Sequence, residues 1–116
     1  MDKTRQAALK AHYRQQPPPP PGIVALRHLH SGRTLLDGSR NASGMLNRHR
    51  FELNLGKHRN AALQADWRRD GAAAFSCAVI DTVKVADDPA FDADAELDAL
   101  LALHRAQWRE QGQPLY

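Results

Sequence analysis

The chain has 116 residues, of which 42% are apolar and 25% are charged, and its net charge at pH 7 is +3. This composition excludes a globally disordered chain, and the length fits one domain with a modest core. The sequence has no apolar run near the roughly 18 residues of a membrane span. Residues 1–16 lack the apolar stretch of a secretory signal, so we expect none. The single cysteine favours a reducing, cytoplasmic location.

The first predicted element is a short helix within residues 1–16. Good helix formers dominate there, and Leu9 and Tyr13 lie four residues apart on one face. The prolines of residues 17–21 end this helix and form a stiff, extended spacer. A proline-rich ligand for a partner domain is the alternative interpretation. We expect residues 22–116 to form the main domain.

A β-hairpin is predicted next, with strands at 22–29 and 34–39 and a turn at 30–33 that contains Ser and Gly. His28 and His30 would point to the same face of the first strand, which is half of a metal site. Because no carboxylate or thiolate is near them in the sequence, we interpret them as a surface pair on an edge strand. No metal site is therefore predicted.

Two helices follow, at 42–54 and at about 60–69, with Gly56 and Gly71 as their stop signals. At 100° per residue, His49 lies in the middle of the apolar stripe of the first helix. We expect a core histidine that is hydrogen-bonded to the backbone.

The strand predicted at 74–85 is rich in β-branched residues and apolar on both faces near its middle. This pattern is typical of a strand that is central or covered on both sides. The last helix is predicted at 93–111. Its apolar stripe consists of Leu97, Leu100, Leu101, His104 and Trp108. The whole order predicts an α+β fold in which helices pack on a small three-stranded sheet.

The charge is distributed unevenly along the chain. Residues 1–71 hold 13 Lys and Arg against five Asp and Glu, whereas residues 72–116 hold three against eight. A basic front half favours a polyanionic partner, most simply nucleic acid, although a merely polarised protein has the same pattern. The candidate phosphate contacts are Arg48, Arg50, Lys57, His58, Arg59, Arg68 and Arg69.

The segment "LNRHRFELNLGKHRNAALQADW", residues 46–67, together with the order hairpin, helix pair, strand and helix, resembles the GIY-YIG nuclease superfamily. The resemblance is to small bacterial members with a short N-terminal helix, and it covers nearly the whole chain. It implies an α+β fold with a small three-stranded antiparallel sheet flanked by helices. Members of this superfamily are typically metal-dependent phosphodiesterases that act on DNA.

The resemblance also implies where catalytic residues should lie. In the superfamily two tyrosines help to activate water, an arginine holds the phosphate, and a glutamate binds a divalent metal. These positions are occupied here by Val24, Leu35, Met45 and Leu101. Valine and leucine can neither activate water nor hold a metal, so we expect no cofactor and a nuclease-like fold whose catalytic side chains have been replaced by packing residues.

Three functions remain open at this point. The first is a non-catalytic module that binds nucleic acid, with DNA favoured, and has no membrane partner. The second is a Mg²⁺-dependent endonuclease with relocated residues, for which Asp37, Arg48 and His49 are the catalytic candidates. The third is a protein-interaction module, for example a homo-oligomer in which the basic front meets the acidic back.

Overall fold

The computed structural model describes residues 20–116. The helix expected within residues 1–16 and most of the proline spacer lie outside the described residues. Strands β1 (Gly22–His28), β2 (Thr34–Ser39) and β3 (Phe75–Thr82) form an antiparallel sheet in the order β2-β1-β3.

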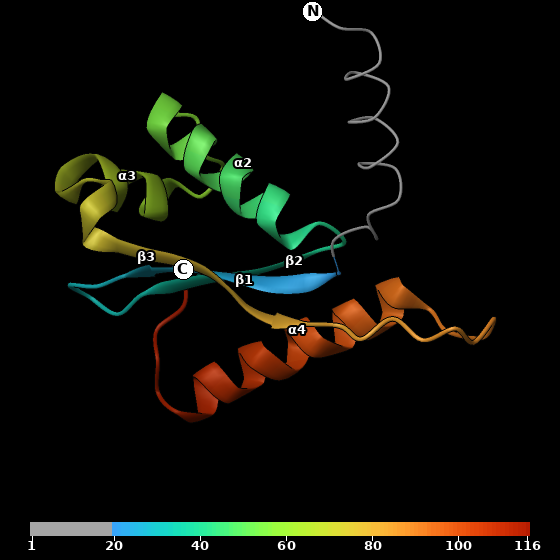
Figure 1. Ribbon diagram of the computed structural model, residues 1–116. Coiled ribbons are helices and arrows are strands. Elements are labelled where there is room, and N and C mark those ends of the chain that lie inside the picture. Colours follow the sequence, from blue (N-terminus) through green and yellow to red (C-terminus); the bar gives the residue numbers. More distant parts are fainter. Residues whose placement is uncertain (1–19) are drawn as a thin grey trace, which may run out of the picture.

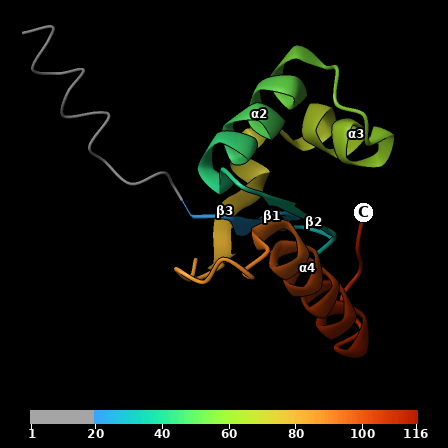
Figure 2. The same ribbon diagram turned by 90° about the vertical axis from the view of Figure 1, so that its right-hand side faces the viewer.

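Helices cover both faces of this sheet (Figures 1 and 2). Helices α2 (Ala42–Leu55) and α3 (Ala61–Asp70) lie on one face, and α4 (Ala93–Glu110) lies on the other. A short 3₁₀ turn, η1 (Ala72–Ala74), joins α3 to β3. The expected α+β fold, with a three-stranded antiparallel sheet flanked by helices, is therefore confirmed. None of the helices within residues 20–116 is long and apolar enough to cross a membrane.

Local sequence signals determine where α2 ends and α3 begins. Gly56 follows α2 with φ +74°, a left-handed conformation that glycine adopts at little cost. Four residues later the side chain of Asn60 accepts a hydrogen bond from the backbone N–H of Leu63 and caps α3. The loop between the two helices is consequently short, and its residues 57–60 stay close to the end of α2.

The most buried strand is β1, in the middle of the sheet, where Ile23, Val24 and Leu26 have no exposed surface. Its side chains contribute to two cores. The core on the α2 and α3 side contains Val24, Leu26, Ala42, Leu46, Leu53, Leu63, Trp67 and Phe75. The smaller core on the α4 side contains Ile23, Val83 and Leu97.

The expectation that the last strand is central or covered on both sides is wrong. Strand β3 lies at the edge of the sheet, and Val79 and Ile80 are 39% and 37% exposed. The physical reason is the position of α4, which packs mainly over β2 and β1. Apolar residues on both faces of a strand therefore do not by themselves indicate a central place in a sheet.

Candidate functional site

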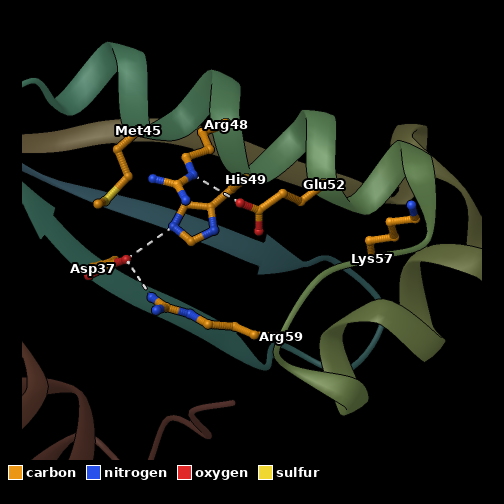
Figure 3. A pocket seen from close by; sticks show the side chains of 7 residues that line it. All are labelled: Asp37, Met45, Arg48, His49, Glu52, Lys57 and Arg59. Atoms are coloured by element: carbon orange, nitrogen blue, oxygen red, sulfur yellow. Dashed lines mark hydrogen bonds and ion pairs between the residues drawn. The ribbon is translucent and has the colours of Figure 1, made fainter.

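A pocket of about 490 Å³ opens between β2, α2 and the loop that joins α2 to α3 (Figure 3). Its lining residues are Asp37 from β2, Met45, Arg48, His49 and Glu52 from α2, and Lys57 and Arg59 from the loop. Three of these side chains are cationic and two are carboxylates, so the lining carries a net positive charge at neutral pH. Such a pocket attracts anions.

A chain of hydrogen bonds runs along the inner wall of the pocket. The backbone N–H of Asn60 donates to Nδ1 of His58 at 3.0 Å, so that nitrogen carries no proton. Nε2 of His58 therefore donates to Nδ1 of His49 at 2.8 Å, and Nε2 of His49 donates to Oδ2 of Asp37 at 3.1 Å. One backbone donor thus determines the tautomers of both histidines in this chain of hydrogen bonds. We call the three residues His58, His49 and Asp37 the histidine relay.

The electrostatics of the relay agree with this proton arrangement. Burial, with the nearby His49, lowers the pKa of His58 below its ordinary value and favours the neutral ring. For Asp37, burial acts to raise the pKa. The hydrogen bonds from His49 and from the backbone N–H of Gly38, together with the charge of Arg59, outweigh burial and leave the pKa of Asp37 lowered. Asp37 is consequently an ionised carboxylate at neutral pH.

The relay is anchored to the surrounding helices by Gln64 of α3, which is itself buried. Its side-chain oxygen accepts from the backbone N–H of His58 at 2.9 Å, and its amide donates to the carbonyl of Leu53 at 3.0 Å. Gln64 therefore joins the end of α2, the loop and α3. The loop that carries the cations of the pocket is held in a defined position.

The expectation for His49 was partly wrong. The ring is buried, as the apolar stripe indicates, but its hydrogen-bond partners are the side chains of Asp37 and His58 rather than the backbone. The reason is that backbone carbonyls inside a helix already accept helical hydrogen bonds, so the ring reaches out to β2 and to the loop. His58 lies nine residues after His49, and this spacing does not by itself indicate that the two rings are in contact.

Three of the candidate phosphate contacts, Arg48, Lys57 and Arg59, lie around this one pocket (Figure 3). The guanidinium of Arg48 pairs with Glu52 at 3.0 Å, and that of Arg59 lies 3.6 Å from Asp37. The side chains of Arg48 and Arg59 remain 77% and 80% exposed. Their head groups are therefore accessible to a ligand from solvent.

The other four candidates do not line the pocket. His58 is buried behind His49 as part of the relay. Arg50 donates to a carbonyl of β3 at 3.3 Å, and Arg68 donates to the carbonyl of Gly56, just after α2, at 3.2 Å. Arg69 pairs with Asp66 at 2.9 Å and with Asp70 at 3.0 Å. The sequence did not indicate that Met45 and Glu52 would line the same pocket.

The four signature positions of the resemblance are scattered across the fold. Val24 is fully buried in the core of the sheet, and Leu35 packs against that core. Leu101 packs into the smaller core under α4, on the opposite face of the sheet from the pocket. Of the four, only Met45 lies in the pocket lining.

A second histidine cluster lies at the other end of β1, and here the expectation of a surface pair on an edge strand is wrong. His28 is 1% exposed on the central strand. Its Nδ1 is hydrogen-bonded to the hydroxyl of Ser31 at 2.7 Å, and the same hydroxyl accepts from the backbone N–H of Arg33. Nε2 of His28 then donates to Asp70 at 2.6 Å. Asp70 lies 42 residues after His28, so the sequence around His28 does not indicate this carboxylate partner.

Charges in this second cluster are satisfied internally. Arg69, and then His28, lower the pKa of Asp70 to about 2. The hydroxyl of Tyr116 donates to Asp66 at 2.6 Å, and burial together with this hydrogen bond raises the pKa of Tyr116. The cluster joins the end of β1, the end of α3 and the C-terminal segment.

Two solved structures share this architecture. One is a point mutant of the catalytic domain of the intron endonuclease I-TevI, with a TM-score of 0.63 over 82% of this chain and 90% of that chain. The other is the catalytic domain of the homing endonuclease I-TevI, with a TM-score of 0.61 over 81% and 94%. Sequence identity is 13% in both cases. No protein-family model matches the sequence, and the search of curated proteins returned no match. The chain therefore has the GIY-YIG nuclease fold.

Proposed function

We propose that this protein binds nucleic acid, with DNA favoured, through the basic pocket and does not cleave it. The observation that carries this proposal is the convergence of Arg48, Lys57 and Arg59 on one cavity. Arginine and lysine are the side chains that bind phosphate diesters, and guanidinium groups bind them through paired hydrogen bonds. The fold supports the proposal, because it is that of an endonuclease catalytic domain.

The existing ion pairs of the pocket do not prevent such binding. The pair between Arg48 and Glu52 and the contact between Arg59 and Asp37 are both largely exposed on the arginine side. Exposed pairs of this kind contribute at most about 1 kcal/mol. A phosphate group can therefore replace the carboxylate as the partner of either guanidinium. Lys57, which makes no ion pair within residues 20–116, adds a third positive charge.

Binding without cleavage is supported by the residues at the signature positions. Val24, Leu35 and Leu101 are packing residues in the two cores, and Met45 is an apolar side chain at the pocket. None of the four side chains can transfer a proton, bind a metal such as Mg²⁺ or neutralise the developing charge of a phosphodiester transition state.

A Mg²⁺-dependent endonuclease is the second candidate, because Asp37 and Glu52 place two carboxylates in one pocket. These residues do not fit a metal well. Each carboxylate is already near a guanidinium, and within residues 20–116 no three metal-ligating side chains come together. DNA cleavage that requires Mg²⁺ and is abolished by Asp37→Ala would favour this candidate over ours.

The proposed binding is tested by titrating labelled duplex and branched DNA with the protein at several salt concentrations. We expect the logarithm of the binding constant to fall linearly with the logarithm of the salt concentration. Arg48→Ala should weaken binding and reduce the slope by roughly one. Arg109→Ala, which removes the same charge from an exposed position on α4, is the matched control and should change neither quantity. Absence of binding at low salt would overturn the proposal.

A further inference from the structure

The outer surface of α2 carries two apolar side chains that do not pack into either core. Phe51 is 64% exposed and Leu55 is 55% exposed. They are four residues apart on the helix, so they lie next to each other one turn apart. We call this pair the apolar ridge.

The ridge borders the basic side of the pocket. Phe51 follows Arg48 by three residues, which places the two side chains on adjacent positions of the helix surface. Leu55 ends the helix, two residues before Lys57. The exposed aromatic ring thus lies next to Arg48, and Arg48 and Lys57 both line a cavity suited to anions.

The size of the ridge limits what can bind it. A specific protein interface buries roughly 800 Å² on each partner, which two side chains cannot provide. One aromatic ring is the size of a nucleobase, and a base that stacks on an aromatic side chain contributes about 1–3 kcal/mol in single-strand binding proteins. The adjacent cations are complementary to the phosphate that accompanies each base.

We propose that the apolar ridge is a subsite for an unpaired nucleobase, which stacks on Phe51 and contacts Leu55 while the neighbouring phosphate is bound by Arg48 and Lys57. This inference rests on the proposed function and adds a substrate class to it. Bases in a duplex are stacked on each other and cannot reach the ridge. The protein should therefore prefer single-stranded segments, or junctions with unpaired bases, over continuous duplex.

The test compares a labelled single-stranded oligonucleotide with a duplex of the same length, for the wild type and for Phe51→Ala. We expect the wild type to bind the single strand more tightly. Phe51→Ala should weaken single-strand binding roughly tenfold, within the range measured for the loss of one stacked base, and change duplex binding less than about twofold. Phe51→Trp should retain the single-strand affinity.

Leu103→Ala is the matched control, because Leu103 is 53% exposed on α4, away from the pocket. It should leave both affinities unchanged. Equal single-strand affinities for Phe51→Ala and Leu103→Ala would overturn the inference, as would an equal loss on both nucleic acids. A concentration-dependent mass that Phe51→Ala abolishes would assign the ridge to a second copy instead.

The two proposals fail in different ways. Salt-dependent binding that is insensitive to Phe51→Ala would remove the base subsite and retain the basic pocket. Absence of binding to either nucleic acid at low salt would remove both.

Discussion

Residues 20–116 contain two buried histidine clusters at different places along one sheet, and one of the two opens on the pocket described above. His49 and His28 are alike in that both ring nitrogens are hydrogen-bonded and one partner is a carboxylate. The carboxylate of Asp37 lies beside the exposed guanidinium of Arg59, which faces the cavity. In the other cluster, Arg69 is held by Asp66 and Asp70.

This difference shows what separates a candidate site from a structural cluster in this fold. A buried histidine with a carboxylate partner occurs in both places and does not distinguish them. The distinguishing feature is positive charge that remains accessible next to a cavity. On this view the histidine relay positions the loop that carries Lys57 and Arg59, whereas the His28 cluster holds the end of β1 against α3.

The largest expected effect is on stability, from His28→Ala. The substitution leaves a cavity in the central strand and removes the partner of two polar side chains, Ser31 and Asp70. We expect the free energy of unfolding to fall by about 2–4 kcal/mol, measured by urea denaturation. The folded molecules of the variant should bind DNA with the same affinity as the wild type. A large change in that affinity would contradict a purely structural role.

The next effect is the pH dependence of stability that comes from His58. Its pKa is lowered in the folded state, so the unfolded chain takes up a proton more readily as the pH falls below the ordinary value of 6.5. The native state is therefore favoured above this pH, and its stability is lost as the pH falls towards the lowered folded pKa. Urea denaturation at pH 7, 6 and 5 should show a progressive decrease.

His58→Gln is the control for this pH dependence. It keeps a polar side chain in the loop but removes the titrating ring, so the decrease between pH 7 and pH 5 should become smaller. Below about pH 4, protonation of Asp37 and Asp70 should destabilise both proteins, because the pKa of each carboxyl is lowered in the folded state. Stability that does not change between pH 7 and pH 5 in the wild type would contradict the lowered pKa of His58 in the folded state.

The smallest expected effect is on DNA affinity, in a comparison of Arg59 at the pocket with Arg69 at the His28 cluster. Arg59→Ala should weaken DNA binding several-fold at moderate salt and lower the salt slope by about one, because it removes a phosphate contact. Arg69→Ala removes the same charge, but Arg69 is not among the residues that line the pocket, and its guanidinium pairs with two carboxylates. We expect it to change DNA affinity less than about twofold. Equal effects of the two variants would mean that net charge, not the pocket, determines binding.

Elements whose boundaries depend on neighbouring residues were predictable from the sequence. Gly56 and Asn60 determine the end of α2 and the start of α3 locally, and the hairpin and the last helix were also predicted close to their observed bounds. The place of β3 was not predictable, because the number of strands that pair with it and the strands that α4 covers are determined by the tertiary fold rather than by the composition of β3.

The candidate site shows the same division between local and long-range information. Arg48, Lys57 and Arg59 are close in the sequence, and their clustering already indicated a phosphate-binding surface, which remains a prediction. The partners of the two histidines come from distant segments: Asp37 lies on a different element from His49, and Asp70 is 42 residues from His28. Pairing of this kind follows from the tertiary fold and has no local sequence signal.

The surface that binds DNA can be mapped by NMR. In ¹⁵N-labelled protein titrated with a short duplex, we expect the largest changes in amide chemical shift at Arg48, Lys57 and Arg59, and we expect the amide signals of Ser31 and Asp70 to be unchanged. Shift changes centred on the His28 cluster, or no shift changes at low salt, would contradict the claim that the basic pocket binds nucleic acid.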